Sequence, residues 1–204
     1  MIIVQNDYRT NGNEFISPYD GNTGFVTETF NNAVPYGGGW TGLLWNWSGN
    51  GTIVSGTTGI NAAPMGVDHV NRDATQYGTV PQDISTTPLS ADASLGAKYN
   101  YLGLWWGSVD EYNKLQFFNN GVLVATVNGL DVNNPANGNQ TAYATNKYVN
   151  ILGVGWFDSF KITSTNYAFE FDNITVGVVP EPTSLLLLGL GLMGIAGIRR
   201  KFKK

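Results

Sequence analysis

Four acidic side chains near the aromatic segments are the best candidates for hydrolytic chemistry. They are Asp110, Glu111, Glu170 and Asp172. Glycoside hydrolysis needs two carboxyl groups at a set separation across a cleft. Glu170 and Asp172 are two residues apart, so a strand would direct both to one face. Neighbouring acids are also common on solvated strand ends, and we predict no enzyme from this set.

A catalytic triad would have to use His69, which is the only histidine of the chain. The residues around it, 65–70, contain no nucleophile elbow, and Gly-x-Ser-x-Gly occurs nowhere in the sequence. The glycines Gly37, Gly38 and Gly39 are not followed by the Lys-Ser/Thr pair of a phosphate-binding loop. We therefore expect His69 to lie in an exposed loop, and we expect no catalytic residues.

Two oxygen-rich segments of the sequence could supply ligands for calcium. Asp131, Asn133 and Asn134 form one candidate set of calcium ligands, and Asp172 with Asn173 forms another. The loop Asp-x-Asp-x-Asp-Gly is absent, and these side chains also bond to turn backbone in many proteins. We expect no cofactor, with calcium as the open possibility.

Trp45 and Trp47 are the candidate residues for stacking on sugar rings. Their spacing of two would place both rings on one face of a strand, about 7 Å apart. The chain has 6 tryptophans and 10 tyrosines, and such rings either form binding platforms or fill a core. Exposed rings over a concave sheet would favour a carbohydrate-binding module that engages extracellular polysaccharide. A buried set would favour a structural protein.

The C-terminal end has the composition of a membrane-directed processing signal. Pro180-Glu181-Pro182 must stay extended, because proline does not enter a helix interior, and it is therefore accessible to a protease. An uncharged run follows at 185–198. Its apolar side chains include Leu185, Leu188, Leu192 and Ile198. We expect this run to form a short hydrophobic helix.

The uncharged run is short for a permanent anchor. Its 14 residues, 185–198, would span roughly 21 Å as a helix, against about 30 Å of hydrocarbon. The basic tail 199–204 begins with Arg199, Arg200 and Lys201, which favour the cytoplasmic side of a membrane. The chain before Pro180 would then lie outside, and so marginal a span suits a segment that is held briefly and cut.

Residues 179–204 resemble the PEP-CTERM sorting signal of exported bacterial proteins in order, spacing and polarity. The resemblance implies recognition by an exosortase, a membrane-embedded cysteine protease, and cleavage near Pro180-Glu181-Pro182. It further implies transient anchoring in the inner membrane, followed by release to the cell surface or extracellular matrix. A simple tail anchor, or a core helix mistaken for a membrane span, is the alternative interpretation.

Charge and cysteine content agree with export. Six basic and fourteen acidic residues precede Pro180, a net charge of −8, which argues against nucleic acid and anionic lipid as partners. The chain has no cysteine, so it can form neither a disulfide nor a thiolate metal site. The first seven residues contain no basic region and no apolar region of a signal peptide. We therefore expect a truncated N-terminus.

Alternating apolar residues and Gly/Asn turns predict strands throughout residues 1–178. Asn119-Asn120-Gly121 between two β-prone runs predicts a tight hairpin. Residues 99–106 are apolar on both faces, which predicts a central strand. The apolar phase changes within residues 168–176, which predicts a β-bulge at Asp172-Asn173.

The other predicted strands are shorter, and their ends are marked by turn residues. They cover residues 25–30, 52–55, 148–154 and 157–163. Residues 61–91 contain three prolines and few apolar runs, which predicts a long loop around one or two short strands. Short strands with turn signals at regular spacing indicate an antiparallel sandwich.

A second resemblance extends over the sandwich. Residues 100–113, with Gly103, Trp106-Gly107-Ser108 and Asp110, resemble a segment of a family of exosortase-dependent bacterial surface proteins. Residues 168–174 resemble its closing strand, and 62–66 match an upstream loop more loosely. The resemblance implies a single β-sandwich with a sorting tail and no defined activity.

The sequence as a whole predicts an all-β protein with two parts. Residues 1–178 are expected to form an antiparallel, jelly-roll-like β-sandwich, and residues 179–204 the sorting signal with its short hydrophobic helix. The predicted function is that of an exported, exosortase-processed surface or matrix protein with a structural or adhesive role. The carbohydrate-binding module is the alternative.

Overall fold

Strands are the main regular elements of the computed structural model, which describes residues 2–32 and 40–180. Every strand pair in it is antiparallel. The predicted all-β, antiparallel class is therefore confirmed. Glu181, Pro182, the uncharged run 185–198 and the basic tail lie outside the described residues. Within residues 2–32 and 40–180, no helix has both the length and the apolar character needed to cross a membrane.

The larger sheet has seven strands in the order β1-β12-β9-β14-β7-β6, with β4 pairing with β14. Its strands are β1 (Ile3–Gln5), β4 (Phe25–Glu28), β6 (Thr52–Ser55), β7 (Gln76–Val80), β9 (Tyr101–Gly107), β12 (Lys147–Leu152) and β14 (Phe169–Gly177). The predicted central strand is confirmed as β9, which lies between β12 and β14 and is buried along its whole length.

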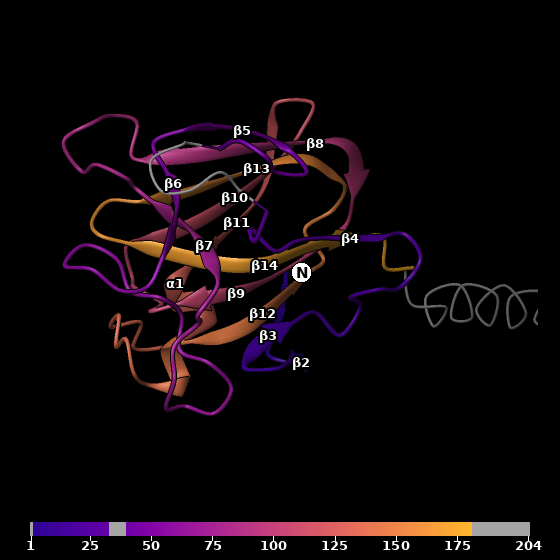
Figure 1. Ribbon diagram of the computed structural model, residues 1–204. Helices are drawn as coiled ribbons and strands as arrows, with labels where there is room; N and C mark the ends of the chain where they lie inside the picture. Colours follow the sequence, from indigo (N-terminus) through magenta and orange to yellow (C-terminus); the bar gives the residue numbers. More distant parts are fainter. Residues whose placement is uncertain (1, 33–39, 181–204) are drawn as a thin grey trace, which may run out of the picture.

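The smaller sheet has five strands in the order β11-β10-β13-β8-β5. They are β5 (Asn46–Gly49), β8 (Ser90–Tyr99), β10 (Asn113–Asn119), β11 (Val122–Asn128) and β13 (Phe157–Ser164). Figure 1 shows β8, β13 and β10 above β14, β9 and β12, so the two sheets form the layers of a sandwich. Apolar side chains from both sheets meet between them in one continuous core.

The remaining elements are small. A hairpin of β2 (Arg9–Asn11) and β3 (Glu14–Ile16) lies beside β12 in Figure 1. It covers the outer face of the seven-stranded sheet, where Phe15 packs with Trp105 and Tyr148 in a second, smaller cluster. Within the described ranges the helical elements are α1 (Gly129–Val132) and the 3-10 turn η1 (Tyr143–Thr145).

The hairpin predicted at Asn119-Asn120-Gly121 is confirmed between β10 and β11. Asn119 pairs with Val122, which leaves Asn120 and Gly121 as a two-residue loop. Their φ angles are +51° and +77°, the positive values that a tight hairpin with right-handed strand twist requires. The sequence predicted this turn because asparagine and glycine tolerate such angles.

The bulge predicted at Asp172-Asn173 is also confirmed. On β14, Asp172 lies opposite Trp105 and Thr175 opposite Gly103, so Asn173 and one further residue face a single residue of β9. Asn173 has a φ of +48°. The extra residue explains the phase change, because both Phe171 before it and Ile174 after it reach the core.

Two groups of strands differ from the sequence expectation. β8 has ten residues, but it was not predicted as a strand. Its first two residues fell in the predicted loop 61–91, and its last residue, Tyr99, fell in the predicted strand 99–106. Tyr99 ends β8 and Tyr101 begins β9, so the predicted central strand begins two residues later than expected. The short strands β1, β2 and β3 were not predicted, because three residues are too few for a periodic pattern.

Candidate functional site

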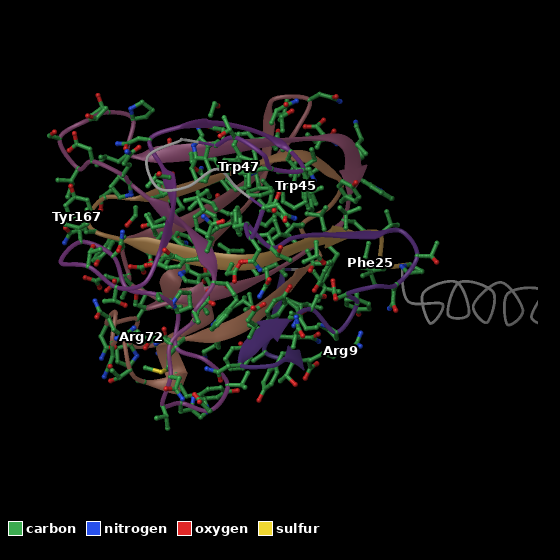
Figure 2. All side chains as sticks on the ribbon, viewed as in Figure 1. Arg9, Phe25, Trp45, Trp47, Arg72 and Tyr167 are labelled. Carbon is green, nitrogen blue, oxygen red and sulfur yellow. The ribbon has the colours of Figure 1, made fainter. Side chains whose placement is uncertain are left out.

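Trp47 lies in β5 and Trp45 directly precedes that strand, and both rings pack against the core. Trp45 is 8% exposed. The Trp47 ring is stacked with Trp40, with centroids 4.7 Å apart, and with Phe171, at 5.9 Å. Figure 2 shows both labelled tryptophans among the side chains between the layers. The pair fills the sandwich, so the structure does not present it as a platform for sugars.

The histidine and the acid pair near residue 110 lie outside the named strands, in loops and turns. His69 is exposed in a loop, as predicted, and contacts Tyr143 edge-on with ring centroids 4.8 Å apart. Glu111 is exposed, whereas Asp110 lies in the turn that Asn113 closes by accepting the Asp110 backbone N–H. These residues have no nucleophile partner in the contacts of the described chain.

Glu170 is one of the two predicted acids that the structure buries on the outer face of β14. Ser108 Oγ donates to its Oε2 at 2.6 Å, and the Ala62 amide donates to its Oε1 at 2.8 Å. Burial raises the pKa of Glu170 to about 8, while these two hydrogen bonds oppose the rise. The side chain thus joins loop 57–64 to β14 and to Ser108, the residue after β9, and its position in the interior is that of a structural link.

The second buried acid, Asp172, belongs to an acidic cluster that the sequence did not reveal as a whole. The acidic cluster consists of Glu14, Asp73, Asp172 and Asn173. Glu14 begins β3, Asp73 follows the isolated bridge between Met65 and Arg72, and the other two residues form the bulge of β14. The bulge matters here because it directs two successive side chains toward the covering hairpin and loop.

Hydrogen bonds fix the geometry of the acidic cluster. Asn173 Nδ2 donates to Glu14 Oε2 at 3.2 Å and to the Phe15 carbonyl at 3.1 Å. The amide and hydroxyl of Thr75 both donate to Asp73 Oδ1, at 2.8 and 2.6 Å. The Asn173 amide donates to Asp172 Oδ1 at 2.6 Å. Each aspartate therefore has one oxygen engaged by donors from the protein.

The other oxygen of each aspartate has no donor. Asp73 Oδ2, Asp172 Oδ2 and Asn173 Oδ1 are buried without a hydrogen-bond partner. The carboxyl groups of Asp73 and Asp172 face each other closely enough for one to donate to the other if it were protonated. Three buried acceptors without donors are costly, because each loses its hydration and gains nothing in return.

Burial raises the pKa of all three carboxyl groups in the acidic cluster. The rise is largest in Asp172, where burial is the main cause and the neighbouring Asp73 adds to it. Burial also raises the pKa of Asp73 and of Glu14. The one ion pair in the described ranges joins Lys161 to Asp92 on the other sheet. Arg72, next to Asp73 in sequence, donates instead to the Ala63 carbonyl at 2.8 Å.

An open pocket of about 780 Å³ adjoins the acidic cluster. Its lining includes Glu14 and Asp73, together with Asn13, Asp68 and Thr75. Solvent can thus approach the cluster from the side of the β2–β3 hairpin.

The candidate calcium ligand Asp131 has another role in the structure: its Oδ2 accepts the Asn128 amide at 2.7 Å and caps α1.

The end of the sandwich is fixed by one side chain. Asn100, between β8 and β9, donates from Nδ2 to the Val179 carbonyl and accepts the Val179 amide at Oδ1, both at 2.8 Å. Its own amide donates to the Gly177 carbonyl at 3.1 Å. Pro180, the first residue of the predicted processing tripeptide, is exposed directly after this contact.

Comparison with known proteins identifies the segment that follows. Residues 178–201 match the family model described as the PEP-CTERM protein-sorting motif, so the chain carries this motif as predicted. The match supports an exported protein that an exosortase sorts and that is held in the membrane before it is cut. No curated protein matches the chain.

One solved structure is distantly similar in shape. It is that of the Clostridium thermocellum N-terminal endo-1,4-β-D-xylanase 10B, CBM22-1–GH10 modules, complexed with xylohexaose. The sequences are 12% identical, and the TM-score is 0.35. The match covers 76% of this chain but only 28% of the xylanase chain. So slight a likeness carries no argument about function.

Proposed function

We propose that the β-sandwich is the cargo of the PEP-CTERM motif and has a structural or adhesive role at the cell surface or in the extracellular matrix. The observation that supports this most is that the matched motif begins directly where the last strand of the sandwich ends. β14 ends at Gly177, and the matched motif begins at residue 178. An exosortase that cuts near Pro180-Glu181-Pro182 would therefore release a domain whose last strand is complete.

The surroundings of the candidate acids support a role without catalysis. Glu170 and Asp172 are 1% and 0% exposed, and they lie beneath the β2–β3 hairpin and the loops that precede β7. A substrate could reach them only if these covering segments moved away. The aromatic side chains are likewise used in packing, because Trp45, Trp105 and Trp106 are all buried.

The alternative is a carbohydrate-binding module, and one surface favours it. Gln116, Phe118 and Lys161 lie on the outer face of the five-stranded sheet, since their neighbours in β10 and β13 face the core. Lys161 Nζ lies 5.9 Å from the Phe118 ring centroid and 3.4 Å from Asp92 Oδ1. An aromatic ring among polar groups is a combination that ligand sites use.

Processing of the tail in a host with an exosortase tests the proposal. Replacing Pro180, Glu181 and Pro182 together by alanine should leave a full-length, membrane-held species, because the protease requires the extended tripeptide. The cell fraction and the intact mass of the protein would be measured. A strain without the exosortase should give the same species from the unaltered gene.

Thr183→Ala, just outside the tripeptide, is the matched control and should be processed normally. Release of mature protein with unchanged mass from the triple variant would contradict the assignment of the tripeptide. The role after release is tested separately by retention on extracellular polysaccharide. Retention that Phe118→Ala abolishes, with Tyr143→Ala as an exposed aromatic control, would favour the carbohydrate-binding alternative.

A further inference from the structure

The acidic cluster contains buried acceptor oxygens that its own hydrogen bonds leave without donors. Among the described residues, seven buried side-chain atoms have no partner, and three of them belong to this cluster: Asp73 Oδ2, Asp172 Oδ2 and Asn173 Oδ1. All three are acceptor oxygens. Two facing carboxylates repel each other unless something positive lies between them, and the buried setting strengthens that repulsion.

We propose that Asp73, Asp172 and Asn173 bind a calcium ion through these three oxygens. The donors are hard oxygens, the kind that calcium prefers, and their other polar atoms are already held by Thr75, Glu14 and Phe15. The ligands are thus preoriented by hydrogen bonds, as in known metal sites. The pocket lined by Glu14 and Asp73 brings solvent to the edge of the proposed site.

The expected site is buried and of modest affinity. Calcium takes six to eight oxygen ligands, so three protein oxygens leave about half of the coordination to water or to small shifts of nearby groups. No group of three or more His, Cys, Asp or Glu side chains has metal-binding geometry in the part of the chain that the structure describes. The site therefore depends on two carboxylates and one amide oxygen, and we expect a Kd of roughly 10⁻⁴–10⁻³ M, as in extracellular modules.

A shared proton is the competing explanation for the two facing carboxyl groups. One protonated aspartic acid could donate to the other, and the raised pKa values of both groups would allow it. A proton would satisfy the two aspartates but would leave Asn173 Oδ1 without a donor. Calcium would engage all three oxygens, and this difference favours the ion.

Calcium titration of the full chain, purified in a mild detergent and treated with EDTA, tests the proposal. At 10 mM calcium the Tm should rise by about 3–10 °C, because the ion binds the folded state alone. Magnesium at the same concentration should have a much smaller effect, since it demands octahedral geometry and keeps its waters. Terbium gives a second readout, because Trp105 lies opposite Asp172 on β9 and can sensitise its luminescence.

Asp73→Asn and Asp172→Asn should each abolish the calcium-dependent rise in Tm. Without calcium both variants should melt at or above the wild-type Tm, since an amide can donate to the facing carboxylate. Glu111→Gln removes an exposed carboxylate away from the cluster and is the control that should keep the full response.

Four results would overturn the proposal. The first is a wild-type Tm that does not respond to calcium, and the second is an equal response to magnesium. The third is a Tm that depends on pH but not on calcium, as a shared proton would give. The fourth is a calcium response that persists in both asparagine variants. If either variant fails to fold, the wild-type terbium titration decides. Saturable emission that calcium displaces supports the site, and its absence refutes it.

Discussion

Asn173 connects the backbone of the sandwich to its acidic cluster. Its positive φ makes the bulge, its amide group bonds to Glu14 and Phe15, and its backbone N–H bonds to Asp172. Asparagine suits all of these roles, because it tolerates the left-handed region better than other residues with side chains and carries both a donor and an acceptor. Few other residue types could satisfy both the backbone and the cluster.

Asn173→Ala should lower the free energy of unfolding by about 2–3 kcal/mol, through left-handed strain and the loss of two buried hydrogen bonds. Asn173→Gly should cost roughly 1 kcal/mol less, because glycine has no strain at this φ. Urea denaturation in EDTA would measure both. Equal losses in the two variants would show that backbone strain is not a factor.

Gly121→Val should destabilise the sandwich by about 1–2 kcal/mol. Gly121 has a φ of +77°, and no atom lies within 4 Å of an added Cβ. The cost is therefore conformational and not steric. Gly121→Asn should retain most of the stability, because asparagine tolerates positive φ. If valine and asparagine have the same effect by urea denaturation, the turn does not limit stability.

At the scale of elements, the sequence predicted features that depend on local chemistry. The hairpin at Asn120-Gly121 and the bulge at Asp172-Asn173 were both found from residue types and apolar phase. β8 was missed because its buried positions include Ala91 and Ala93, and alanine is a weak strand signal. The alternation of these alanines and Leu95 with Asp92 and Ser94 was nevertheless present in the sequence.

The site depended on contacts that sequence patterns do not contain. The side chains of Glu14 and Asn173 meet although they are 159 residues apart. Only Asp172 and Asn173 could be proposed as ligands in advance, because the bulge and the oxygen donors are adjacent in sequence. Trp45 and Trp47 show the limit of periodicity: a spacing of two predicts a shared face but does not tell which face is buried.

Asn100 joins the end of β14 to the turn between the two sheets, so its effect extends to the whole molecule. Asn100→Ala should increase hydrogen exchange at the Val179 amide by at least about fivefold, because it removes one net hydrogen bond from that group. The global Tm should change little, since Val179 lies after the last strand. Hydrogen exchange of the full chain, followed by NMR or mass spectrometry, would measure this.

Lys98→Ala is the control for this test, because Lys98 donates to Asn119 on the neighbouring hairpin and does not contact Val179. It should leave the exchange of Val179 unchanged. If Asn100→Ala leaves that exchange unchanged as well, the contact does not hold the end of the domain in solution.

Because Asn100 holds Val179, the connection between the domain and the membrane begins at residue 180. Only five residues, 180–184, separate Val179 from the uncharged run, and they reach at most about 18 Å when extended. With that run in the bilayer, as its composition predicts, the sandwich would rest almost on the lipid. Trp156 and Val178, 49% and 40% exposed near this end, would face the headgroups. The cut would have to be made within that narrow gap, and only then could the domain diffuse away.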